Sequence, residues 1–95
     1  MRKIIWSERA KREFDHTYEF WTNHNKSSSY SEKLLDETLK KIRLIAENPK
    51  IGSLSKKKKL RRVLVLENYS ISYSLSSGSI KIHSFFDNRR DPRNL

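Results

Sequence analysis

The feature that most constrains the fold is a strict alternation of apolar residues and serines in the second half of the chain. Tyr69, Ile71, Tyr73 and Leu75 alternate with serines at positions 70, 72 and 74. A period of two predicts a β-strand, because successive side chains of a strand point to opposite faces of a sheet. One face of this strand is therefore expected to be buried by a second layer of structure, and the other face to be open.

Two amphipathic helices upstream of that strand are expected to supply the second layer. The first is predicted over residues 8–25 with Ser7 as its N-cap, and the second begins at Ser29 and ends before Pro49. Their apolar residues recur at intervals of three and four, which is helical spacing. These residues are Ala10, Phe14, Tyr18 and Trp21 in the first helix and Leu35, Leu39, Ile42 and Ala46 in the second, with Leu34 and Ile45 beside them. The short polar connection between the two helices predicts a helical hairpin.

Three further segments have the apolar and β-branched composition of strands. They are residues 2–7 before the first helix, and residues 61–66 and 79–86 on either side of the alternating segment. The predicted fold class is therefore α+β. Elements in the order β-α-α-β-β-β form an antiparallel sheet with the helical hairpin packed on one face, in one domain of residues 1–95.

The chain is strongly basic, and this charge narrows the class of its partners. Across 95 residues, 21 Lys and Arg stand against 11 Asp and Glu, which gives a net charge of +10. Such a charge favours a polyanionic partner, either a nucleic acid, a ribosome or an acidic protein. The absence of cysteine excludes disulfides and thiolate metal sites, and no segment reads as a signal peptide or a membrane span, so a cytoplasmic location is expected.

The sequence contains no motif for a metal ion or a nucleotide, so no cofactor is expected. Its three histidines are scattered, and its two glycines do not form a phosphate-binding loop. One reaction that needs no cofactor is the cleavage of RNA by its own 2′-hydroxyl, which requires a base and fixed cations at the phosphate. His83 is the natural titrating group for it, and the candidates to bind phosphate are Arg61, Arg62, Arg89 and Arg90. The alternative role of His83 is that of a structural or merely exposed residue.

The face of the sheet that looks away from the helices is the expected site for an anionic ligand. Alternation places on it Ser70, Ser72, Ser74, Lys81, His83, Phe85 and Asp87. Candidate nucleic-acid-binding residues are the run Lys56, Lys57, Lys58 and Lys59, the cations Arg62, Lys81 and Arg90, and Phe85, whose ring is expected to stack on a base. The alternative is a solvated sheet face beside a solvated basic loop. Asp87 is expected to orient His83 or an arginine, or to form a surface ion pair.

Four segments carry a resemblance to a known family of proteins. They are Ile5-Trp6-Ser7-Glu8-Arg9-Ala10, Glu47-Asn48-Pro49-Lys50-Ile51-Gly52, Asn68-Tyr69-Ser70-Ile71-Ser72-Tyr73 and Phe85-Phe86-Asp87-Asn88-Arg89-Arg90-Asp91-Pro92. In their order and spacing, and over nearly all of its length, the chain resembles the RelE/ParE superfamily, the small basic toxins of bacterial type II toxin-antitoxin systems. The resemblance implies the same order of elements, and a cognate acidic, partly disordered antitoxin that holds the toxin inactive in a hetero-oligomer.

The superfamily contains two functional classes, and the resemblance leaves both open. RelE-like members cut messenger RNA in the ribosomal A site, whereas ParE-like members inhibit DNA gyrase without cleaving nucleic acid. The resemblance places Arg61 on a catalytic basic residue and Arg89 on a phosphate-binding arginine. Two other positions that carry cations in RelE-like nucleases are Val63 and Ser70 here, and the late tyrosine of some of these nucleases is missing.

His83 and Tyr73 are the candidates to replace the missing groups, so the candidate catalytic set is His83, Arg61, Arg89 and Tyr73. We therefore expect a metal-independent endoribonuclease, an mRNA interferase that acts on the ribosome. Inhibition of DNA gyrase is the alternative. A third reading is a nucleic-acid-binding module without toxicity, which basic charge and an aromatic-bearing sheet would serve equally well.

Overall fold

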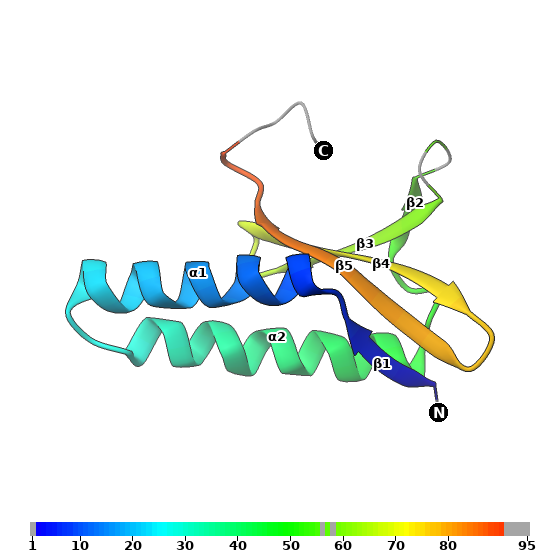
Figure 1. Ribbon diagram of the computed structural model, residues 1–95, viewed down its shortest axis with the longest axis horizontal. Coiled ribbons are helices and arrows are strands. Elements are labelled where there is room, and N and C mark those ends of the chain that lie inside the picture. The colour runs from blue at the N-terminus through cyan, green and yellow to red at the C-terminus, as the bar shows by residue number, and fades with distance from the viewer. Residues whose placement is uncertain (1, 56, 58, 91–95) are drawn as a thin grey trace.

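The structure, a computed structural model that describes residues 2–55, 57 and 59–90, has two helices packed on one face of a five-stranded sheet (Figure 1). The helices α1 (Glu8–Asn25) and α2 (Ser29–Glu47) form the predicted hairpin. The strands are β1 (Lys3–Trp6), β2 (Ser53–Ser55), β3 (Leu60–Val65), β4 (Tyr69–Ser76) and β5 (Ser79–Asp87). The predicted α+β class is confirmed. No helix in the described part of the chain is long and apolar enough to cross a membrane.

The sheet differs from the predicted one in two respects. Its strand order is β1-β5-β4-β3-β2, and β1 runs parallel to β5, so the sheet is mixed and not fully antiparallel. The additional strand β2 pairs over three residues with β3, in a segment for which no strand was predicted. Both differences concern short edge strands. The pattern of a short strand does not specify its neighbour or its direction, and three residues are too few to display a period of two.

Strand β1 pairs with the first part of β5, and the start of helix α1 lies along the next part of the same edge. Ser7 is the N-cap of α1, as predicted: its Oγ accepts a hydrogen bond from the backbone N–H of Ala10 (3.0 Å) and donates one to the carbonyl oxygen of His83 (3.0 Å). Further along α1, Glu13 Oε1 accepts a hydrogen bond from the backbone N–H of Phe85 (3.1 Å). These bonds satisfy backbone groups of β5 beyond the end of β1, and they fix His83 relative to the helix.

The core lies between the helices and the sheet. Tyr69, Ile71 and Tyr73 are fully buried in β4, as the alternation predicted. In α2, Leu35 and Leu39 are exposed (38% and 48%), so the predicted stripe is displaced. The buried residues of α2 are Ser31, Leu34, Thr38, Ile42 and Ile45. Two polar residues interrupt this buried stripe and hide it from an analysis of hydrophobic spacing.

A β-bulge between β4 and β5 decides which side chains face the open side of the sheet. Ser72 pairs with Ser84, but the next pair is Tyr73 with Ile82, so His83 is an extra residue in β5. A bulge leaves one residue of a strand without a partner and interrupts the alternation of faces. Before His83, the even-numbered residues of β5, such as Ile82, face the helices. After His83, the odd-numbered residues, such as Phe85, do so.

The bulge corrects the predicted position of Phe85. Beyond it, Phe85 pairs with Ile71 on the helix-facing side and is 1% exposed, whereas Phe86 faces the open side. The Phe85 ring stacks on Tyr69 (5.4 Å between centroids) and meets Phe14 edge to face (5.0 Å). The expectation that Phe85 lies on the open face is wrong, because an inserted residue shifts the phase of alternation without changing any residue type.

Candidate functional site

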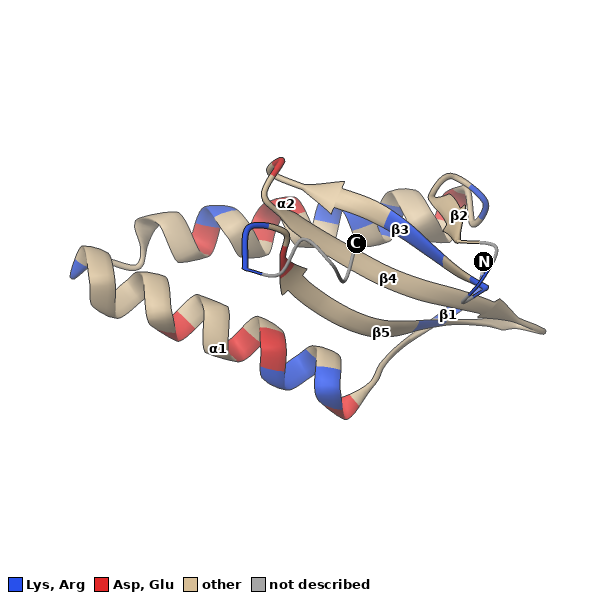
Figure 2. Ribbon diagram, turned by 90° about the horizontal axis from the view of Figure 1, so that it is seen from above, with Lys and Arg blue, Asp and Glu red and all other residues tan. Residues whose placement is uncertain are grey.

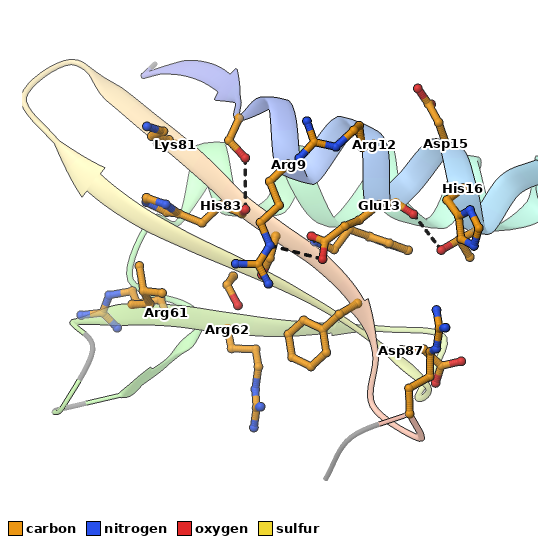
Figure 3. A pocket seen from close by; sticks show the side chains of 18 of the residues that line it. Arg9, Arg12, Glu13, Asp15, His16, Arg61, Arg62, Lys81, His83 and Asp87 are labelled. Atoms are coloured by element: carbon orange, nitrogen blue, oxygen red, sulfur yellow. Dashed lines mark hydrogen bonds and ion pairs between the residues drawn. The ribbon is translucent and has the colours of Figure 1, made fainter. Parts of the chain in front are cut away.

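Figure 2 shows the sheet with α1 beside β5 and with β2 beyond β3. A groove of about 1420 Å³, whose side chains are drawn in Figure 3, is lined by residues of α1 and of the strands β2, β3, β4 and β5. We call it the open-face groove. Its charged and titratable lining residues are Arg9, Arg12, Glu13, Asp15, His16, Glu19, Arg61, Arg62, Lys81, His83, Asp87 and Arg90. Cations outnumber carboxylates among them, so the groove favours an anionic ligand.

His83 lies at the bulge, where Ser74 and Ser7 hold it from two sides. Its Nε2 is 2.7 Å from Ser74 Oγ, and the two atoms share a hydrogen bond. Partial burial and, second, the positive charge of Lys81 lower the pKa of His83 below its ordinary value of about 6.5. The imidazole is therefore neutral at pH 7, the form that can accept a proton.

Tyr73 and Arg61 hold the segment between α2 and β2. The Tyr73 hydroxyl donates a hydrogen bond to the carbonyl oxygen of Pro49 (2.8 Å) and accepts one from the backbone N–H of Gly52 (3.0 Å). Arg61 Nη1 donates to the carbonyl oxygens of Lys50 (3.1 Å) and Gly52 (2.9 Å). Tyr73 is fully buried on the helix-facing side, so its hydroxyl does not lie in the open-face groove.

Arg89 is engaged by Asp87 and Tyr69. Its Nε and Nη2 donate to the two carboxylate oxygens of Asp87, both at 2.9 Å, and its guanidinium lies 5.8 Å from the centre of the Tyr69 ring. These hydrogen bonds from Arg89 lower the pKa of Asp87, and they raise that of Arg89. Asp87 thus forms an ion pair with Arg89, which agrees with the predicted ion pair and with the predicted orientation of an arginine. The described residues contain no group of three His, Asp or Glu side chains that could hold a metal ion.

Two positions that carry cations in RelE-like nucleases, Val63 and Ser70 in this chain, have structural roles here. Ser70 is fully buried, and its Oγ donates a hydrogen bond to Asn88 Oδ1 (2.7 Å). Val63 pairs with Ile71 in the neighbouring strand and packs against the core. No positive charge is therefore supplied at either position.

The candidate nucleic-acid-binding residues are divided between several locations. Arg62 lines the groove from β3 and Lys81 lines it from β5 (Figure 3). Arg90 is also one of the lining residues. Lys57 and Lys59 are exposed in the turn between β2 and β3, whereas Lys56 and Lys58 lie outside the described residues. Phe85 is in the core, as described above.

Sequence reasoning missed several residues of the groove. Arg9, Arg12 and Glu13 line it from α1, and Phe86 lines it from β5. The helical residues are spaced by three and four and so share one face of α1, a signal that was present in the sequence. The position of Phe86 could not be predicted in this way, because nothing in the alternation of residue types indicates the bulge that turns Phe86 toward the groove.

Comparisons with known proteins agree with this fold. A family model described as "ParE toxin of type II toxin-antitoxin system, parDE" matches residues 4–92. A solved structure titled "Chromosomal ParDE TA system from P. aeruginosa" is similar, with a TM-score of 0.76 and 13% sequence identity over 92% of this chain and 96% of that chain. No curated protein matches the sequence. Because the family model spans nearly the whole chain, this chain belongs to the ParE toxins of type II toxin-antitoxin systems.

Proposed function

We propose that this toxin arrests growth by binding DNA gyrase, as the ParE-like class does, and not by cleaving messenger RNA. The observation that carries the proposal is the engagement of the candidate catalytic side chains. Tyr73 and Arg61 hold the loop before β2, and Arg89 is paired with Asp87. Three of the four candidates are thus bonded to the backbone or to a charged side chain, and the fourth, His83, shares a hydrogen bond with Ser74.

Cleavage of RNA without a metal ion requires a base and several cations that meet at one phosphate. Among the four candidates, His83 is the exception. It lines the groove, and the hydrogen bond of its imidazole is to the neutral hydroxyl of Ser74. With Val63 and Ser70 in place of cations, two of the charges that the resemblance places at a scissile phosphate are missing. A toxin that works by binding needs no such set. Its basic charge suits both an acidic antitoxin and a complex of gyrase with DNA.

Purified toxin is expected to inhibit the supercoiling of relaxed plasmid by gyrase and to leave messenger RNA intact on translating ribosomes. The experiment runs both assays on one sample and maps every new 5′ end at nucleotide resolution. Poly-lysine of matched net charge is the control for unspecific effects of a polycation. Ribosome-dependent cuts in the A-site codon, with unimpaired supercoiling, would contradict the proposal.

A second candidate function, ribosome-dependent cleavage of messenger RNA, is favoured by one observation: His83 lines the groove at the bulge and is bonded to Ser74, and burial and the charge of Lys81 lower its pKa. If it operates, His83→Ala is expected to slow cleavage at least about 100-fold, the usual effect of removing a general base. His24→Ala, a histidine of α1 that does not line the open-face groove, is the matched control. Equal cleavage rates in the two variants would remove His83 from the reaction.

A further inference from the structure

A compact set of cations and hydroxyls occupies the open side of the three central strands. Arg62 of β3 pairs across the sheet with Ser72 of β4, and Ser74 of β4 pairs with Lys81 of β5. His83, the extra residue at the bulge, is bonded to Ser74. We call Arg62, Ser72, Ser74, Lys81 and His83 the open-face patch.

The positive charges of this patch have no carboxylate partner within the part of the chain that the structure describes. Neither Arg62 nor Lys81 forms an ion pair with another described residue. Two of the four acidic lining residues are engaged elsewhere, since Glu13 binds Arg9 and the backbone of Phe85, and Asp87 binds Arg89.

Of the remaining charged lining residues, Arg61 lies on β3 and is bonded to the backbone of Lys50 and Gly52, and the others lie on α1 and at the end of β5. Asp15 and Glu19 are exposed on α1, together with Arg12 and His16, and Arg90 is exposed after β5. The unneutralised charges of Arg62 and Lys81 make the electrostatic potential at the patch positive, and Lys81 thereby disfavours the protonated form of His83. This positive potential favours the binding of an anion.

We propose that the open-face patch binds the phosphodiester backbone of a nucleic acid. Arg62 and Lys81 stand on strands that are separated by one strand, about 10 Å across the sheet, so the patch fits a chain of phosphates better than a single one. The guanidinium of Arg62 can bind a phosphate with two hydrogen bonds, Lys81 acts as a point charge, and the serines add donors to phosphate oxygens.

This inference deepens the proposed function and rests on it for the source of the ligand, because gyrase acts on DNA. A toxin that binds both gyrase and the DNA on gyrase would have a higher affinity for the complex than for the free enzyme, because the second contact then forms within one assembly. The same phosphodiester chemistry occurs in RNA. The experiment therefore contains an arm for each nucleic acid.

The test measures binding of the full chain to a fluorescent 20-base-pair DNA duplex and to a single-stranded RNA of 20 nucleotides, over a range of salt concentrations. The double variant Arg62→Gln/Lys81→Gln is expected to bind at least about tenfold more weakly, and the slope of log K against log salt should fall by about two, one for each lost phosphate contact. The control is Lys33→Gln/Arg43→Gln, which removes the same charge from exposed positions of α2. It should change affinity less than about threefold, since it removes only long-range attraction.

Equal losses in the two double variants would overturn the proposal, because the effect would then come from net charge and not from the patch. Binding of poly-glutamate that depends on Arg62 and Lys81, without such dependence for either nucleic acid, would overturn it in favour of an acidic polypeptide. Tighter binding of the duplex assigns DNA as the source of the phosphates, and tighter binding of the single strand assigns RNA. Patch-dependent DNA binding without inhibition of gyrase would leave this inference standing and remove the proposed function, whereas inhibition without DNA binding would do the reverse.

Discussion

Replacing Phe85 by alanine is expected to lower the free energy of unfolding by about 3–5 kcal/mol, the usual cost of removing a buried aromatic ring. The side chain is 1% exposed, and its ring contacts Tyr69 and Phe14. A domain of this size has a total stability of about 5–15 kcal/mol, so the variant would lose a large part of it. Urea unfolding followed by tryptophan fluorescence measures the change.

Phe86→Ala is the matched control, because it removes the same ring from the next residue. Phe86 is only partly buried, on the groove side of β5, so its removal should cost less than about 1.5 kcal/mol. The comparison tests the bulge directly. Had the simple alternation continued through His83, Phe86 would be in the core and Phe85 in the groove, and the order of the two losses would be reversed.

The parts of the fold that could be predicted are those in which the local pattern and the tertiary structure agree. Helix α1 has its predicted limits because Ser7 caps it and its apolar residues repeat at helical spacing. Strand β4 buries the predicted face because its alternation is uninterrupted. The buried stripe of α2 was displaced because Ser31 and Thr38, which are polar, occupy it.

The site was less predictable because residue types do not specify hydrogen-bond partners. Arg61 and Tyr73 have the chemistry of phosphate binding and proton transfer, but each is bonded to the backbone between residues 49 and 52. Arg89 has a carboxylate two residues earlier, and this spacing was visible in the sequence. The open-face patch was partly foreseen, since Arg62 and Lys81 were among the predicted nucleic-acid ligands.

The loop before β2 is expected to depend on the contact between Gly52 and Tyr73. Tyr73→Phe leaves the Gly52 N–H and the Pro49 carbonyl without their partner and should cost about 1–3 kcal/mol of unfolding free energy. Gly52→Ala should cost a similar amount, about 1–3 kcal/mol, by overpacking. Its new Cβ would lie 2.8 Å from the Tyr73 hydroxyl oxygen and 2.9 Å from the Arg62 carbonyl oxygen.

A double-mutant cycle shows whether these two changes act on one contact. Because phenylalanine has no hydroxyl, Gly52→Ala should be less costly in the Tyr73→Phe background than in the native chain, and the two losses should not add. Full additivity would contradict the contact.

The Tyr73→Phe variant also distinguishes a structural role of Tyr73 from a catalytic one. If Tyr73 serves only the loop, Tyr73→Phe keeps its growth-inhibiting activity at temperatures where it stays folded, whereas a tyrosine that takes part in catalysis would lose activity in a fully folded protein.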